Sequence, residues 1–357
     1  MKVMQVIPVL DLAGAETMCQ NLAIELHKMG HEVMVVSLYK KETVLTENLR
    51  NESIPVEWMD KKNGLDPSCI FRLYRLIRQF NPDVVHSHIY AGKYAHIAAM
   101  MAGVKNKVYT VHNVAQKEAT DSNKRMNKVL FKKLGVVPVA LTQEIQKSIE
   151  DVYGLDESKI PVVFNGIPLE KCKPIQVYKK NATEIVHVGR FFEAKNHRNL
   201  IYAFADVHTK FPDIHLKLYG DGPLRNDMET LVSELQIDNY IHFMGLTNDV
   251  YSVMSEADVF ILPSIYEGMP MTLIEAMATG LPIITTPVGG IVDMLEDGSE
   301  AIFTGTDSDS IADSICRLVD NAELRQSLGH AALERSKQFS AGAMAEKYTE
   351  LYGRKVK

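Results

Sequence analysis

The chain has 357 residues, a formal net charge of −6, 46% hydrophobic residues and 24% charged residues. This composition is ordinary for a soluble globular protein, and no apolar stretch approaches the roughly 20 residues that span a bilayer. A sequence pI of about 6.1, without an aromatic-studded basic sheet, argues against nucleic-acid binding.

The first half of the chain alternates short β-branched runs with helical patterns. The expected strands are 2–10, 31–39, 83–88, 107–112, 137–142 and 160–166. The expected helices are 15–30, 91–102, 121–134 and 143–153. Prolines and lysines then break the periodicity over 168–182, which is typical of a linker.

The alternation restarts after this linker. The expected strands are 183–190, 214–220, 240–245, 258–264 and 281–287. The expected helices are 196–211, 223–236, 249–256, 271–280 and 307–320, and 322–357 is expected to be helical with a break at 339–342.

Strand–helix alternation predicts parallel sheets with helices on both faces. Because the length suggests two domains, we expect an α/β protein with two doubly wound, Rossmann-like domains, 1–170 and 171–340, that face each other across a cleft. Ligands of such sheets lie beyond the carboxyl ends of the strands.

The charge is unevenly distributed between the two halves. Residues 1–180 carry +6 and residues 181–357 carry −12. Such a split indicates two bodies with different neighbours, the first facing something anionic. An uneven spread of solubilising charge explains the same numbers equally well.

Four cysteines, Cys19, Cys69, Cys172 and Cys316, lie far apart and form no C-x-x-C pair. This spacing favours reduced thiols over a disulfide framework or a zinc site. The first apolar run, VMQVIPVL, lacks the flanks of a secretory signal peptide. The sequence therefore predicts a cytoplasmic protein.

Several expected strands end in a glycine that precedes a helix. Gly189 is followed by Arg190 and Lys195, and Gly220 and Gly222 precede a proline suited to a first helical turn. Glycine lets the backbone approach a ligand, and free amides at a helix start favour an anion. The two cations suffice to hold a diphosphate. Glycines that merely close turns are the alternative, and the stronger one for Gly220 and Gly222.

Two glutamates eight positions apart occur in PSIYEGMPMTLIEAMATG. Glu267 follows a strand, and Glu275 lies about one turn into the next helix. A carboxylate in an apolar helix is costly unless it meets donors. Sugar hydroxyl pairs are such donors, and the amides of Gly268 to Met271 are placed to take phosphate or sugar oxygens. The spacing alone is weak, because about two such pairs are expected by chance.

An ordered set of motifs gives these features a context: AGAE (13–16), HSH (86–88), TVHN (110–113), FNGIP (164–168), VGRF…KN (188–196), GDGP (220–223), FMG (243–245), E-x7-E (267–275), GLP (280–282) and VGG (288–290). With this set the sequence resembles the family 4 glycosyltransferases of the GT-B fold, retaining enzymes that use nucleotide-diphosphate sugars. The resemblance covers essentially the whole chain, and with it we expect the closing helix, about 341–357, to pack back on the first domain.

The resemblance implies a role for each matching residue. Arg190 and Lys195 would bind the donor diphosphate. Glu267 would contact the transferred sugar, and Glu275 would accept hydrogen bonds from the ribose hydroxyls. The donor-binding set is completed by Gly14, Gly268, Met269, Pro270, Met271 and Thr272.

In the first domain the resemblance implies that His112 lies beside the donor sugar and the developing charge, so the expected catalytic residues are His112, Arg190, Lys195 and Glu267. The expected acceptor-side residues are Ala15, Glu16 and His88. The family commonly has two glycines in the first loop, whereas this chain has Ala13 before Gly14. That departure bears on the tightness of the loop.

Two further patterns resemble metal sites. We expect His86 and His88 to face opposite sides of their strand and therefore to make a poor metal pair. Asp307-Ser308-Asp309 has the form of a D-x-D metal motif, but Asp is a good N-cap for the helix that follows, and capping is preferred. We expect no metal and no cofactor, with the cationic turn stabilising the departing diphosphate instead.

Two basic helices with apolar faces, 70–80 and 122–134, are expected in the first domain. Such helices lie on anionic membrane surfaces. Ordinary surface helices packed on a sheet have the same pattern.

The sequence thus predicts a retaining, metal-independent hexosyltransferase. It would move a sugar from a nucleotide-diphosphate sugar, with UDP favoured, to a saccharide or lipid-linked saccharide in cell-surface polysaccharide synthesis. We expect it in the cytoplasm, with peripheral contact at the inner face of the membrane. Two alternatives stay open: an epimerase or phosphorylase on the same fold, and a non-catalytic partner subunit.

Overall fold

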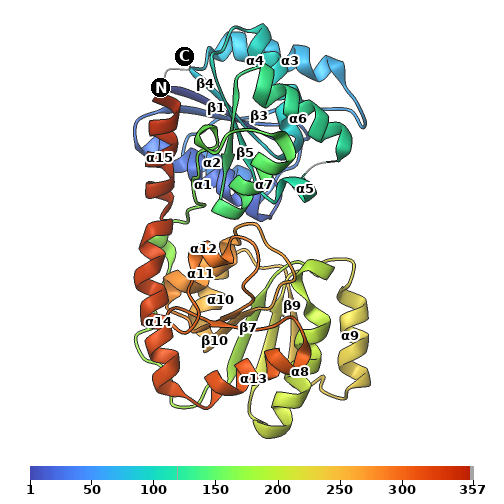
Figure 1. Ribbon diagram of the computed structural model, residues 1–357, viewed down its shortest axis with the longest axis vertical. Coiled ribbons are helices and arrows are strands. Elements are labelled where there is room, and N and C mark those ends of the chain that lie inside the picture. Colours follow the sequence, from blue (N-terminus) through green and yellow to red (C-terminus); the bar gives the residue numbers. More distant parts are fainter. Residues whose placement is uncertain (119, 354–357) are drawn as a thin grey trace. The chain divides into compact units, whose positions relative to one another are not determined.

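The computed structural model describes residues 1–118 and 120–353 and divides the chain into two compact units (Figure 1). The first unit comprises Met1–Ile167 and the residues from Phe339 onward, and the second comprises Pro168–Gln338. In the described part of the chain, no helix is both long and apolar enough to cross a membrane. All four cysteines are free thiols, as predicted.

The first unit is built on a six-stranded sheet with the order β3-β2-β1-β4-β5-β6 and parallel pairing throughout. Its strands are β1 (Lys2–Ile7), β2 (Glu32–Ser37), β3 (Val56–Trp58), β4 (Val84–His88), β5 (Asn106–Val111) and β6 (Val136–Ala140). The chain order reverses between β1 and β4. Ligands of doubly wound sheets bind at such a switch point, beyond the carboxyl ends of the strands.

Helices follow each strand of the first unit: α1 (Gly14–Lys28), α2 (Val44–Asn51), α3 (Pro67–Phe80), α4 (Gly92–Met101), α5 (Ala115–Glu118), α6 (Asp121–Lys133) and α7 (Gln143–Tyr153). Their ends carry local signals. Asp66 accepts the Cys69 N–H at the start of α3, and Thr142 accepts the Ile145 N–H at the start of α7. The last helix, α15 (Ala341–Gly353), packs on α1 within this unit.

The second unit has a second six-stranded sheet, ordered β12-β11-β10-β7-β8-β9 and also parallel. Its strands are β7 (Glu184–Val188), β8 (His215–Tyr219), β9 (Ile241–Gly245), β10 (Val259–Leu262), β11 (Ile283–Thr285) and β12 (Ile302–Phe303). Here the order reverses between β7 and β10, so the loops after these two strands flank the switch point.

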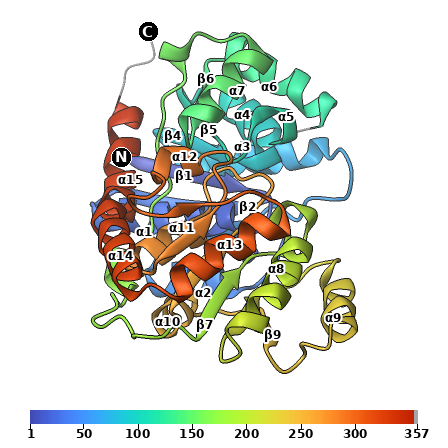
Figure 2. The ribbon, with the colours of Figure 1, turned by 60° about the horizontal axis from the view of Figure 1, so that its bottom comes forward.

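The helices of the second unit are α8 (His197–Lys210), α9 (Arg225–Glu234), α10 (Val250–Glu256), α11 (Met271–Thr279), α12 (Ile291–Met294), α13 (Ser308–Val319) and α14 (Ala322–Ser336). α8 and α13 lie side by side (Figure 2). The linker 168–182 is irregular but anchored, because Ile175 N–H donates to Thr279 O and the Tyr178 hydroxyl to Gly280 O.

One expected strand is wrong. Residues 160–166 form a single bridge with β6, between Ala140 and Val162, and no strand. Pro161 has no N–H to donate, which limits ladder pairing at this edge of the sheet. The short elements β3, β12, α2, α5 and α12 were not expected from the sequence.

Candidate functional site

The loops after β7 and β10 bring together residues that are far apart in sequence. A 3-10 turn, Glu193–Lys195, follows β7, and the segment 263–270 follows β10. Asn196, with a left-handed φ of 59°, donates its side-chain amide to Pro263 O and Thr306 O. Ile265 N–H donates to Ala194 O at 2.8 Å. The two loops are therefore fixed to one another at the switch point.

Lys195 and Glu267 form an ion pair at this position. The Lys195 Nζ lies 2.5 Å from Glu267 Oε1, and the two side chains are 19% and 11% exposed. The fully buried Ser264 donates its hydroxyl to the same oxygen at 2.6 Å. A charged pair held by a third group in a partly desolvated place is preorganised for a polar ligand. The structure thus brings Lys195 and Glu267, two of the four expected catalytic residues, into contact.

Arg190 follows β7 after Gly189 and is exposed. Its guanidinium lies 4.6 Å from the centre of the Phe192 ring, a cation–π contact. No carboxylate of the described residues pairs with it in a salt bridge. Arg190 therefore keeps its hydrogen-bonding capacity for an anion.

Glu275 is the second glutamate of the motif. Its side chain is 6% exposed within α11, and burial raises the pKa of its carboxyl to about 7. It contributes, after burial, to the raised pKa values of Tyr251 and Cys172, which places it among these groups. The two glutamates of the motif therefore occupy different surroundings in the second unit.

The turn between them is held by close backbone packing. Gly290 N–H donates to Gly268 O, and a Cβ on Gly289 (φ 61°) would lie 1.9 Å from Glu267 O. α11 then begins with Pro270 as its N-cap and no side-chain cap. The first amides of an uncapped helix favour an anion. Met269 and Met271 are buried at this start, and Thr272 is half-buried.

The glycines of GDGP have a packing role. A Cβ on Gly220 would lie 2.0 Å from Gly189 O, and one on Gly222 would lie 2.6 Å from Phe191 O. Phe191 N–H donates to Asp221 O at 3.0 Å. The close approach that requires glycine is therefore to the neighbouring loop. This packing against the loop after β7 is a reason for the glycines that neither interpretation from the sequence had given.

In the first unit, β4 and β5 end in a cluster of histidines. His88 Nδ1 lies 3.1 Å from His112 Nε2, and His88 Nε2 lies 3.0 Å from Gln5 Oε1. The rings of His86 and His88 are 4.3 Å apart. The expectation that they face opposite sides was wrong, because residues two apart in a strand share a face.

Hydrogen-bond chemistry fixes the protons in this chain. The Gln5 carbonyl oxygen accepts, so it takes the Cys19 Sγ–H and the His88 Nε2–H. Burial lowers the pKa of His88 well below its usual value, so its Nδ1 carries no proton and accepts from His112 Nε2–H. Burial also lowers the pKa of His112 to about 3. His112 is therefore neutral at physiological pH and keeps a lone pair on Nδ1.

His86 belongs to a separate network with the last helix. Its ring nitrogens lie 2.7 Å from the Tyr352 hydroxyl and 2.7 Å from the Thr110 hydroxyl, and Thr110 contacts the Tyr348 hydroxyl at 2.7 Å. Both ring nitrogens are used internally. This arrangement gives His86 a structural role in joining α15 to β4 and β5.

The loop after β1 has Ala13 where the family commonly has a glycine, and its conformation suits an alanine. Ala13 has a φ of −148°, an extended conformation that any residue adopts, and α1 starts at Gly14 without a side-chain cap. Ala15 follows in the first turn, and Glu16 is buried there. Ala13 therefore requires no left-handed conformation.

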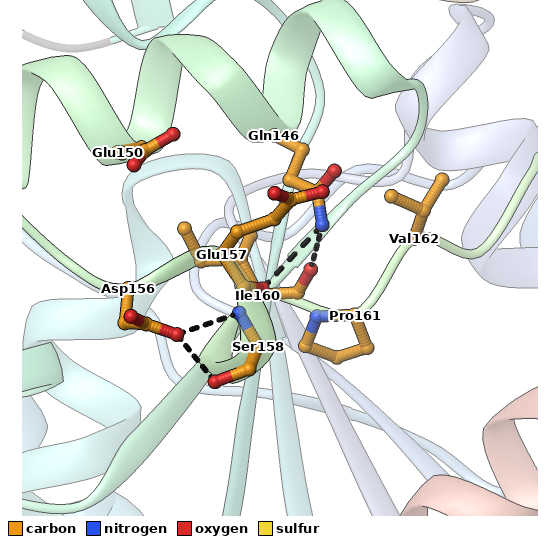
Figure 3. Close-up of a pocket in the computed structure, with 8 residues that line it drawn as sticks. All are labelled: Gln146, Glu150, Asp156, Glu157, Ser158, Ile160, Pro161 and Val162. Carbon is orange, nitrogen blue, oxygen red and sulfur yellow. Dashed lines mark hydrogen bonds between the residues drawn. The ribbon is translucent and has the colours of Figure 1, made fainter.

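Other candidate sites lie elsewhere. Asp307 accepts the Ser310 N–H at 2.9 Å and caps α13, as predicted. A pocket in the first unit lies against α7 (Figure 3), and its lining contains none of the expected site residues. There Ser158 donates to Asp156, and the Gln146 amide donates to Ile160 O.

Three residues of the site were not anticipated from the sequence: Ser264, Asn196 and Gln5. Ser264 closely follows a buried strand and Asn196 ends the motif VGRF…KN, but neither pattern gave these residues a role. The partners of Asn196 and Gln5 are set by segments distant in sequence.

The family models decide the identity. Residues 12–171 match the model of glycosyltransferase family 4, and residues 170–335 match that of glycosyl transferases group 1. The chain is a family 4 glycosyltransferase. The predicted GT-B fold is confirmed by solved structures: HepE of Anabaena in complex with UDP-glucose has a TM-score of 0.85 with 19% identity, covering 98% of each chain.

Relatives of this family 4 glycosyltransferase include a galactosyltransferase of Escherichia coli named for UDP-Gal and α-D-GlcNAc-diphosphoundecaprenol. It is 28% identical, and the match covers 84% of each chain. A second relative is the N-acetylgalactosaminyltransferase of Campylobacter jejuni that acts on a diphospho-undecaprenol-linked saccharide. It is 24% identical over 76% of this chain and 77% of the relative.

Proposed function

We propose that this glycosyltransferase moves a sugar from a UDP-sugar to a saccharide carried on a lipid diphosphate, with retention of anomeric configuration. The names of the Escherichia coli and Campylobacter jejuni relatives support the acceptor class. The titles of the Anabaena structures, which contain UDP or UDP-glucose, support the nucleotide.

The observation that carries the proposal is the group formed by Lys195, Glu267 and Ser264 beside exposed Arg190 at the switch point of the second sheet. Arg190 and Lys195 supply positive charge for the departing diphosphate, together with the uncapped start of α11. Glu267, held by two donors on one oxygen, orients the transferred sugar. The buried carboxyl of Glu275 accepts from the ribose hydroxyls.

The chemical step follows from these roles. The bond from the anomeric carbon to the β-phosphate oxygen breaks, and its electron pair leaves with the UDP. The acceptor hydroxyl attacks the same face, and its proton passes to the departing phosphate oxygen. In the first unit, burial keeps His112 neutral, so its Nδ1 offers a hydrogen-bond acceptor without adding charge. No metal takes part in this scheme.

We also propose peripheral membrane contact through α3 and α6. Leu65 is 78% exposed just before α3 and Phe71 is 59% exposed within it, beside exposed Arg75. α6 adds exposed Val129 among lysines. Apolar side chains with nearby cations suit an anionic bilayer surface. Phe71→Ser should lower co-sedimentation with anionic vesicles, and equal binding of both proteins would contradict this contact.

The decisive experiment supplies UDP-galactose, UDP-glucose and UDP-N-acetylglucosamine with a lipid-diphosphate-linked saccharide and measures released UDP and glycosylated lipid. We expect transfer with one of these donors and an α-linked product by NMR. Release of an epimerised sugar, phosphate-dependent cleavage, or no UDP binding by calorimetry would each contradict the proposal.

A further inference from the structure

A buried lysine without a carboxylate partner lies at the carboxyl edge of the first sheet. Lys61, in the loop after β3, is 7% exposed. Its Nζ donates to the Tyr39 hydroxyl at 2.8 Å and to the carbonyls of Lys62 and Gly64 at 2.8 and 2.7 Å. The nearby carboxylate of Asp66 is engaged by Arg72 and Ser68. The positive charge of Lys61 is therefore held in place but not neutralised.

A second lysine lies near the same aromatic ring. Lys93 is in the first turn of α4, and its Nζ is 5.5 Å from the centre of the Tyr94 ring, whose centre is 5.3 Å from Lys61 Nζ. The Lys93 Nζ donates to the Asn123 side-chain oxygen at 3.1 Å. Burial, and then the charge of Lys61, lower the pKa of Lys93. Among the described residues neither lysine forms a salt bridge.

Two tyrosine hydroxyls complete the cluster. Because Tyr39 accepts a hydrogen bond from Lys61, its own O–H is free to donate elsewhere. Tyr90, directly after β4, is 40% exposed. Burial, followed by Tyr39, raises the pKa of Tyr90, and the Glu16 carboxylate adds to this rise while Lys61 opposes it. The Tyr90 hydroxyl therefore lies within electrostatic reach of Tyr39 and of the Lys61 ammonium.

The backbone places Tyr90 in an unusual way. Ile89 has a left-handed φ of 51°, which β-branched residues rarely adopt. Such conformations persist where the surrounding structure fixes a neighbouring group. Tyr90 and Lys93 follow the end of β4, which is one of the two strands that flank the switch point of this sheet.

We propose that Tyr39, Lys61, Tyr90 and Lys93 form an anion subsite that binds the phosphate or diphosphate group of the acceptor. The subsite rests on the proposed function, because it assigns part of the acceptor to the first unit. Neither lysine has a carboxylate in a salt bridge among the described residues, so the two positive charges repel one another, and a bound anion relieves that cost. Lys93 and the tyrosine hydroxyls supply the hydrogen bonds, and Lys61 supplies a fixed charge behind them.

The test compares two acceptors that carry the same saccharide, one on a lipid diphosphate and one on a neutral alkyl chain. Lys93→Met and Tyr90→Phe should each lower kcat/KM for the diphosphate acceptor roughly 10–100-fold more than for the neutral one. Lys105→Met is the matched control, because Lys105 is exposed just before β5, at the opposite edge of the same sheet. Equal losses on both acceptors would overturn the subsite.

A binding measurement separates this inference from the proposed function. Pyrophosphate is titrated into the protein saturated with UDP, so that the donor site is occupied. Wild type and Lys105→Met should bind it, whereas Lys93→Met and Tyr90→Phe should bind at least 10-fold more weakly. The subsite would be overturned if pyrophosphate did not bind to wild type, or if it bound equally to all four proteins. Inactivity with every UDP-sugar would count against the proposed function alone.

A third arm distinguishes the acceptor phosphate from a phospholipid headgroup. Vesicles of phosphatidylglycerol without acceptor should bind wild type and Lys93→Met equally. A selective loss of vesicle binding in Lys93→Met would assign the cluster to the bilayer surface and overturn the acceptor subsite.

Discussion

The switch-point strands of the two sheets end in different polar chemistry. Charged side chains follow β7 and β10 in the second unit: exposed Arg190 and the Lys195–Glu267 pair. At the ends of β4 and β5 in the first unit lie His88 and His112, which burial keeps neutral. The same strand–loop–helix topology therefore supports either a charged or an uncharged site.

The charged side chains of the second unit and the neutral histidines of the first suit different chemical tasks. Fixed charges stabilise the charge that develops on a departing diphosphate. Neutral imidazoles donate and accept hydrogen bonds without adding charge. Variants that remove the charges should therefore damage turnover most.

The largest expected effect comes from the charges. Arg190→Ala and Glu267→Ala should each lower turnover by about 10²–10³-fold, because each removes a group that acts on the reacting centre. The measurement is UDP release under saturating donor. Arg198→Ala and Glu193→Ala, which remove exposed charges from the same region, are matched controls. Near-normal turnover in both site variants would show that the chemistry lies elsewhere.

Much of this charged site was accessible from the sequence. Arg190 and Glu267 directly follow or closely follow apolar strands, and parallel strands place their carboxyl ends at one edge. The long strands and helices were found for the same reason, because sustained apolar patterns report burial. Strand β12 (Ile302–Phe303) and helix α12 (Ile291–Met294) are too short to show any period.

The parts of the sites that were not predicted depend on contacts between residues distant in sequence, which no local pattern encodes. Gln5 meets His88 across 83 positions, and Asn196 meets Thr306 across 110. The shared face of His86 and His88 was encoded in their spacing and was misinterpreted. The pairing of Lys195 with Glu267 needed the strand order, which the sequence does not state.

The buried acid of the second unit should make stability depend on pH. The pKa of Glu275 is raised from 4.5 to about 7 in the folded protein. Between these values the native state binds more protons than the unfolded state, so the free energy of unfolding falls as the pH rises and levels off above about 7. Glu275→Gln should remove this slope and stabilise the free protein above pH 7 by about 3 kcal/mol at most.

Denaturant unfolding between pH 4 and 8 measures this slope. Exposed Glu234→Gln is the control, and it should keep the wild-type pH dependence. Under the proposed function, Glu275→Gln also weakens UDP binding, since an amide offers one acceptor oxygen where a carboxylate offers two. Parallel curves for wild type and Glu275→Gln would show that this carboxyl does not titrate near 7.

A smaller effect on turnover is expected from changes to the neutral histidines of the first unit. His88 holds His112 through Nδ1, so His88→Leu leaves the His112 N–H without its acceptor. We expect kcat to fall by about 10–100-fold through misplacement of the ring. His88→Asn, whose side-chain oxygen replaces Nδ1, should recover much of the rate, and His88→Gln should not. Equal rates for the Asn and Leu variants would show that His88 serves only the core.

The smallest effect tests whether the carboxyl edge of the second unit needs a metal. Asp307 accepts from Ser310 N–H and caps α13, and these hydrogen bonds lower its pKa. Asp307→Ala should lower Tm by about 2–4 °C with turnover retained, whereas Asp307→Asn preserves the cap and should match wild type. EDTA should leave the turnover of all three proteins unchanged. Loss of activity in Asp307→Ala at an unchanged Tm would show that Asp307 binds a metal instead of capping α13. Loss of turnover on chelation would show that the cationic turn of Arg190 and Lys195 does not account alone for the departure of the diphosphate.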